Sequence, residues 1–155
     1  MISVSSVACF YVFCRLLLPI LPNPAVHAGW SKIRPMSTEP IVSLDELKSR
    51  IREFAFARQW ESYHTPKNLA MALIVEAAEL VERFQWLSPE ESAKLDPERR
   101  EQVRQEIADV LIYLTRLADL LDIDLLEAAA DKLEINAHKY PVEQARGNAA
   151  KYNEF

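Results

Sequence analysis

The sequence has very little glycine, cysteine or histidine. Its only two glycines, Gly29 and Gly147, lie far apart, which excludes a Walker phosphate loop and a GxGxxG fingerprint because each needs several neighbouring glycines. Both cysteines, Cys9 and Cys14, lie near the start, so the rest of the chain has neither a disulfide framework nor a thiolate zinc site. Three histidines stand against 23 Asp and Glu residues, and this excess of oxygen ligands favours Mg²⁺ or Mn²⁺ over zinc.

Positive charge is also scarce. The formal net charge of −5 over 155 residues gives no basic footprint for a nucleic-acid polymer. Any phosphate group must therefore be held by metal ions, side chains or helix ends. An acidic protein still binds anionic nucleotides when metal ions bridge the two. Half of the residues are hydrophobic, which is enough to build the core of one domain.

The first segment, residues 1–35, differs from the rest because it contains no acidic residue. Its apolar run is interrupted by Arg15 and Pro19 and is too short for a membrane span. Three interpretations stay open: translation starting at Met36, a signal peptide, or an organelle transit peptide. We predict a leader at 1–35 and a catalytic domain at 36–155 without a membrane segment, located in the cytoplasm unless the leader directs it to an organelle or to secretion.

The remaining chain is predicted to be all-α. Apolar residues recur at helical spacing, and no stretch shows the sustained alternation of a strand. Cap residues and prolines define the helix starts. The result is a bundle of four main helices, which we expect to self-associate because apolar residues also lie outside the core face. The predicted helices are 43–58, 66–87, 97–121 and 124–140, with a short helix or turn from 88 and a polar tail at 142–155 that covers a neighbouring chain or the site.

Two of these helices carry an acidic pair beside an apolar seam. Glu76 and Glu79 share one helix face, and Glu106 and Asp109 share another. If the two helices pack side by side, four carboxylates converge, and a bound cation relieves their repulsion. The alternative is a set of surface acids paired with arginines. These arginines are Arg83, Arg104 and Arg116. The core stripe predicted for the helix at 97–121 consists of Val103, Ile107, Val110, Leu114, Leu117 and Leu121.

Glu76 is the most informative of the four carboxylates. It lies one turn from both Leu73 and Leu80, where an unpaired buried charge would cost several kcal/mol. Glu76 must therefore have a partner, be neutral, or face a cleft. In a magnesium site, a carboxylate that is not fully used in coordination, either Glu76 or Glu79, would orient or deprotonate a water molecule.

Aromatic and polar residues outside the helix seams form a second group of candidates. Trp60, in a loop at 59–65, and Trp86, on the flank of Glu79, would stack on a base, and packing in the core is the alternative for each tryptophan. His64 either bonds a base or phosphate or caps the loop. Lys132 and Asn136 lie on one face of the last helix and would meet phosphate oxygens unless that face is simply solvated.

The acidic spacing Glu76-x-x-Glu79 … Glu106-x-x-Asp109 resembles the motif of MazG-like, all-α nucleoside triphosphate pyrophosphohydrolases. Within that family, four further segments resemble the dCTP pyrophosphatases most closely, and the resemblance covers about residues 43–155. Those segments are RQWESYHTPKNLAMALIVEAAELVERFQW, QEIADVLIYL, KLEINAHKYP and AKYNEF.

The resemblance implies a function and a set of site residues. It implies Mg²⁺-dependent hydrolysis of a deoxynucleoside triphosphate, dCTP or a modified dCTP, to the monophosphate and pyrophosphate for nucleotide-pool sanitation, by a homotetramer built from dimers with sites at subunit contacts. Ile51 replaces a histidine of animal relatives and leaves the cytosine preference open. The alternatives are a pyrophosphohydrolase of different base specificity and a non-catalytic helical interaction protein. The matched residues are Glu76, Glu79, Glu106 and Asp109 for the metal, Trp60, His64, Trp86 and Tyr113 for base and sugar, and Lys132 and Asn136 for the phosphates.

Overall fold

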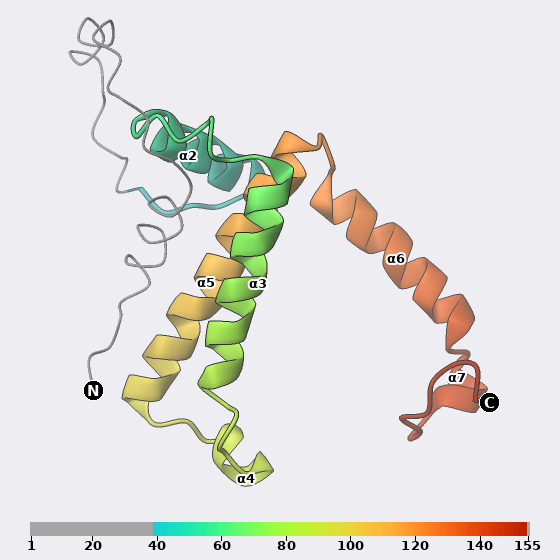
Figure 1. Cartoon of the computed structure of the whole chain (residues 1–155). Coiled ribbons are helices and arrows are strands. Elements are labelled where there is room, and N and C mark those ends of the chain that lie inside the picture. Colours follow the sequence, from blue (N-terminus) through green and yellow to red (C-terminus); the bar gives the residue numbers. More distant parts are fainter. Residues whose placement is uncertain (1–38, 155) are drawn as a thin grey trace, which may run out of the picture.

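The structure is a computed structural model that describes residues 39–154, and Figure 1 shows its arrangement. Within those residues the chain is helical and contains no strand, so the all-α prediction is confirmed. The leader predicted at residues 1–35 lies outside the described residues. No helix among those described is long and apolar enough to cross a membrane. The elements are α2 (Leu44–Phe56), α3 (Pro66–Glu82), α4 (Pro89–Ser92), α5 (Pro97–Leu120), α6 (Leu125–Lys139) and α7 (Val142–Ala145).

The helices begin where the sequence predicts, because side-chain caps satisfy the free N–H groups of each first turn. Ser43, Thr65 and Asp96 each accept a hydrogen bond from the backbone N–H three residues later. Asp124 accepts two such bonds at the start of α6. At α4, Ser88 takes part in a complete capping box. These caps fix the boundaries of the long helices independently of how the helices pack.

The predicted end of the helix at 66–87 was wrong by five residues. We predicted a helix to Leu87, but α3 ends at Glu82 and residues 83–87 form tight turns with i→i+3 bonds such as Phe84 N–H to the Val81 carbonyl (3.0 Å). Ser88 must be extended to cap α4, so the chain leaves the helix before it. Side chains beyond Glu82 therefore do not follow the helical face that carries the acidic pair.

The fold centres on α3 and α5, which pack side by side and run in opposite directions, while α2 lies across the far end of α5 (Figure 1). Arg52 of α2 and Arg116 of α5 both donate to the Asp119 carboxylate, which is almost fully buried. This ion network ties α2 to α5. The buried apolar side chains come from α2, α3 and α5; they are Ile51, Ala55, Leu69, Val103, Tyr113 and Ala118.

The core stripe predicted for α5 is only partly buried in the single chain. Val103 is buried, but Ile107 is 52% exposed and Leu114 is 38% exposed. The reason is that α3 packs against the face of α5 that bears Glu106 and Tyr113. The neighbouring apolar face of α5 is not covered by another part of the described chain. The sequence pattern therefore identified an apolar seam correctly but assigned it to the wrong contact.

The fourth main helix, α6, projects away from the α3–α5 pair (Figure 1), so the four helices do not close into a bundle within one chain. Its apolar side chains Leu126 and Leu133 are consequently exposed. The predicted position of the tail over a neighbour or the site stays a prediction, and within the single chain the tail folds back on the end of its own helix. There the Tyr140 and Tyr152 rings meet edge to face, with centroids 6.0 Å apart, and the Lys139 ammonium lies 5.3 Å from the Tyr152 ring.

Candidate metal centre

Three carboxylates meet where α3 packs against α5. Glu76 lies near the middle of α3, Glu79 follows it by one turn, and Glu106 faces both from α5. One oxygen of each carboxylate lies within 4.8 Å of the others, which is close enough for a single ion to contact all three. The pairing of two acidic helix faces predicted from sequence is thus present in the fold.

Glu76 and Glu106 each have one buried carboxylate oxygen without a hydrogen-bond partner in the described chain. Glu76 is only 1% exposed, and neither its Oε2 atom nor that of Glu106 has a hydrogen-bond partner among residues 39–154. Burial raises the pKa of Glu76 to about 7, and the charges of Asp109, Glu79 and Glu106 add to the effect. Glu76 therefore lacks a hydrogen-bond partner for Oε2 within residues 39–154, and either a proton or a bound cation compensates its buried charge.

Asp109 lies just outside the tight group. It is half-buried on α5, and its charge is the second cause of the raised pKa of Glu76, so the two carboxylates are close in space. Tyr113, one turn further on, is buried on the same helix. The fourth member of the predicted acidic set therefore borders the cluster without sharing its 4.8 Å core.

The donor set suits a hard divalent cation. Every ligand in the group is a carboxylate oxygen, and two of the three carboxylates, Glu76 and Glu106, also have a buried oxygen without a hydrogen-bond partner among the described residues, as expected for groups that bind an ion. A structural role for the acids would instead pair each of them with a base. Glu106 does receive hydrogen bonds from Arg83, but Arg104 bonds Glu101 and Arg116 bonds Asp119, so only one predicted arginine partner reaches the cluster.

The loop after α2 turns Trp60 back onto the helix. Gln59 adopts φ = 56°, a conformation that few residues other than glycine accept, and the Trp60 N–H then donates to the Ala55 carbonyl (3.0 Å). The Trp60 ring meets Phe54 edge to face at 5.8 Å and lies 6.2 Å from His64. Trp60 is half-buried, so it has both the predicted packing contacts and an accessible face.

His64 is poised as a neutral hydrogen-bonding group. Its Nδ1 atom is buried and has no partner within the described range. Burial lowers the pKa of His64, the positive charge of Arg116 lowers it further, and Glu61 opposes both effects. The imidazole is therefore uncharged at neutral pH, with one ring nitrogen available for a ligand or a water molecule.

Three other predicted residues lie away from the carboxylates in a single chain. Trp86 is 87% exposed in the turns after α3, and it does not share the helical flank of Glu79 as we expected. Lys132 is exposed and Asn136 is half-buried on α6. This helix follows the C-terminal end of α5 and points away from the α3–α5 pair (Figure 1). The single chain therefore brings together the metal candidates but leaves part of the predicted substrate pocket dispersed.

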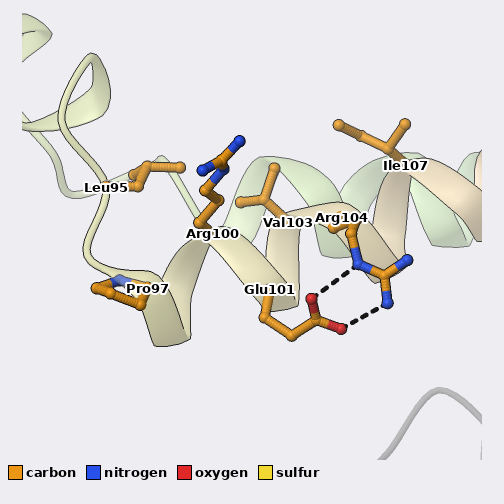
Figure 2. A pocket seen from close by; sticks show the side chains of 7 residues that line it. All are labelled: Leu95, Pro97, Arg100, Glu101, Val103, Arg104 and Ile107. Atoms are coloured by element: carbon orange, nitrogen blue, oxygen red, sulfur yellow. Dashed lines mark hydrogen bonds and ion pairs between the residues drawn. The ribbon is translucent and has the colours of Figure 1, made fainter.

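A separate hollow of about 610 Å³ lies at the start of α5. Figure 2 shows the apolar side chains of Val103 and Ile107 turned toward it, with the Glu101–Arg104 ion pair at its edge. None of the four carboxylates lines this hollow. It belongs to the uncovered apolar face of α5 and is not part of the acidic cluster.

The sequence did not reveal the residues that stabilise this architecture from a distance. The spacing of Arg116 and Asp119 is typical of an intrahelical pair, but nothing in the pattern indicates that Arg52, 67 residues earlier, completes their network. Arg83 was considered only as a structural partner of an acid. Its position between the end of α3 and Glu106 depends on where α3 ends, which the sequence did not give.

These features define an all-α protein with a buried carboxylate centre of the kind that holds a divalent cation. The chain belongs to the MazG-like family, whose family model matches residues 71–155. It is 40% identical to mouse dCTP pyrophosphatase 1 over 124 residues, which is 79% of this chain and 73% of the mouse protein. The human protein of the same name is 39% identical over 121 residues, which is 77% of this chain and 71% of the human protein.

A solved structure resembles the fold. The crystal structure of a pyrophosphatase from Archaeoglobus fulgidus superposes with a TM-score of 0.61 and 45% sequence identity, covering 66% of this chain and 96% of the archaeal one. The match therefore includes almost all of the archaeal chain.

Proposed function

We propose that this chain is a Mg²⁺-dependent nucleoside triphosphate pyrophosphohydrolase that acts on dCTP or a modified dCTP, with residues 36–155 as its catalytic domain and Mn²⁺ as an alternative ion. The observation that carries the proposal is the group of three carboxylates from α3 and α5 within 4.8 Å, two of them with a buried, unpartnered oxygen. The names of the mouse and human relatives supply the nucleotide. Such an enzyme removes unwanted nucleotides from the pool.

The chemistry follows from the acidic centre. Mg²⁺, when bound, neutralises phosphate charge and lowers the pKa of water. The residues that would hold it are Glu76, Glu79, Glu106 and Asp109. A water molecule attacks the α-phosphorus, the bond from that phosphorus to the oxygen bridging to the β-phosphate breaks, and pyrophosphate leaves. The proton of the water passes to whichever carboxylate, Glu76 or Glu79, is not fully used in coordination.

The base and sugar are assigned to the aromatic residues. Trp60 stacks on the base while neutral His64 and the buried Tyr113 supply hydrogen bonds, and the exposed Trp86 closes over the ligand. Ile51 is buried in the core and offers no polar contact. We therefore assign recognition of cytosine to the loop at 60–64 and not to Ile51 of α2.

The residues assigned to the phosphates are proposed to act in a second copy of the chain. Lys132 and Asn136 lie on α6, which stands apart from the carboxylates in the single chain, and we propose that they reach the site of a neighbouring subunit. A homo-oligomer, with a tetramer of paired dimers as the expected form, also covers the apolar faces that the single chain exposes. Those faces include Met71, Ile74 and Val81 on α3, Ile107, Leu111 and Leu114 on α5, and Leu126, Leu133 and Ile135 on α6.

The test is pyrophosphate release by the full chain with Mg²⁺ and each of the four deoxynucleoside triphosphates. We expect dCTP to be preferred, Glu76→Gln and Asp109→Asn to abolish turnover with the helical circular dichroism retained, and Glu101→Gln, an exposed carboxylate on α5, to behave as wild type. Loss of folding together with activity in both variants would make the carboxylates structural. Equal rates with all nucleotides would support a broader specificity. The alternative of a helical interaction protein would be favoured if the wild type released no pyrophosphate from any nucleotide and if Trp60→Ala behaved in this assay as the wild type does.

A further inference from the structure

Arg83 contacts the acidic centre in an unusual way. It is the C-terminal cap residue of α3, and its guanidinium reaches across to Glu106 of α5. Its Nη2 atom lies 2.9 Å and its Nε atom 3.3 Å from the same carboxylate oxygen, Oε1. The other oxygen, Oε2, is buried and has no hydrogen-bond partner among the residues that the structure describes. The two oxygens of Glu106 are therefore in different states.

The burial of the two side chains favours a fixed carboxylate. The Glu106 side chain is 6% exposed and that of Arg83 is 29% exposed, so their contact is largely shielded from solvent. A guanidinium that donates two bonds to one oxygen fixes the plane of the carboxylate and leaves the second oxygen for another ligand. The unpartnered Oε2 belongs to a carboxylate that also takes part in the three-residue acidic group.

We propose that Arg83 is a positioning residue that restricts Glu106 to one coordinating oxygen and so sets a preference for Mg²⁺ over Ca²⁺. Mg²⁺ takes about six ligands at short distances and accepts carboxylates through one oxygen. Ca²⁺ takes about six to eight ligands and often binds both oxygens of a carboxylate. By holding Oε1, Arg83 withholds the additional oxygen that Ca²⁺ would use, and it does so without touching the ion. The inference rests on the proposed function for the presence of the ion.

The experiment compares two dissociation constants, one for Mg²⁺ and one for Ca²⁺, measured by titration calorimetry on the full metal-free chain without nucleotide. Arg83→Met removes the hydrogen-bond donors at similar side-chain length. The loss of the positive charge strengthens the binding of both divalent ions about equally. The ratio of the two constants therefore isolates the geometric effect. We expect the preference for Mg²⁺ over Ca²⁺ to fall about tenfold, the lower end of the roughly 10–100-fold that partners of metal ligands contribute to affinity.

Two further variants complete the test. Arg104→Gln removes the same charge from an exposed pair on α5, with Glu101, and is expected to leave the ratio unchanged. Arg83→Lys keeps the charge but replaces the two nitrogens on Oε1 with one, so we expect a smaller fall in the preference. It also serves if Arg83→Met does not fold. An unchanged ratio in the folded Arg83 variants would overturn the proposal.

The outcomes separate this inference from the proposed function. A wild-type chain that binds neither ion and releases no pyrophosphate would refute the proposed function and this inference with it. A wild-type chain that binds Mg²⁺ and hydrolyses dCTP, with the same ion preference after Arg83→Met, would refute the role of Arg83 alone.

Discussion

Glu76 gives the sharpest prediction, because its effect on stability should reverse with the metal content of the buffer. Its carboxyl is buried beside three other acids, and its pKa rises from 4.5 to about 7. At about 1.4 kcal/mol per pKa unit, the folded chain loses about 3 kcal/mol of unfolding free energy when this group ionises. This stability is fully present below pH 4.5, the unfolded value, and is lost as pH rises through about 7.

Glu76→Gln keeps the shape of the side chain and removes the titration. In EDTA at pH 5 the variant should unfold at nearly the same temperature as wild type. In EDTA at pH 8 the variant should be more stable by about 3 kcal/mol, a rise of roughly 10 °C for a domain of this size. Mg²⁺ at about 100 times its dissociation constant adds about 2.7 kcal/mol to the wild type and little to the variant, so it should remove the difference.

Thermal unfolding followed by circular dichroism, at one protein concentration and with three buffers, measures all of these differences. Glu101→Gln, an exposed carboxylate on α5, should follow the wild type in every buffer. The reasoning fails if Glu76→Gln gains nothing at pH 8 in EDTA, or if it gains equally at pH 5. The first result would mean that the charge of Glu76 is already compensated in the metal-free fold, and the second that the gain does not come from the ionisation of Glu76.

Three other predictions concern residues outside the carboxylate centre. Asp119→Asn should lower the free energy of unfolding, measured in urea, by about 2–3 kcal/mol, because it leaves the buried Arg116 without its charged partner. The control Glu101→Gln changes an exposed ion pair and should cost under about 0.5 kcal/mol. Leu114→Asp should convert the assembly to smaller species by light scattering, and an unchanged mass would exclude this face of α5 from the interface. Trp86→Ala should leave the melting temperature unchanged but raise KM for dCTP about tenfold; an unchanged KM would remove Trp86 from the pocket.

The helices could be predicted from sequence because their boundaries are encoded locally. Ser43, Thr65, Asp96 and Asp124 each cap the helix that follows, and such a bond involves residues two or three apart. The end of α3 could not be predicted in the same way. The end of α3 depends on the extended conformation that Ser88 must adopt before Pro89. The helical spacing of apolar residues gives no sign of this end, because it continues beyond Glu82.

The acidic centre was predictable for a different reason. Carboxylates at positions of an apolar seam are costly, so their presence indicates a compensating partner even before the packing is known. What periodicity could not supply was the face of α5 that meets α3. An apolar stripe and an acidic stripe lie side by side on that helix, and packing within one chain covers the acidic one, with Glu106 and Tyr113, while Ile107 and Leu114 stay exposed.

That arrangement links the assembly to the site. A helix pair that buries Glu76 and Glu106 gains less from its contact than one that buries leucines, so the apolar faces left outside have to contribute stability elsewhere. The faces of α3, α5 and α6 that remain exposed in one chain are available for this purpose, and covering them would bring α6 of one subunit toward the carboxylates of another. If the proposed homo-oligomer forms, the chain places its costly acidic residues where one fold assembles them and its apolar residues where a second copy covers them. Formation of the oligomer and completion of the phosphate site would then be the same event.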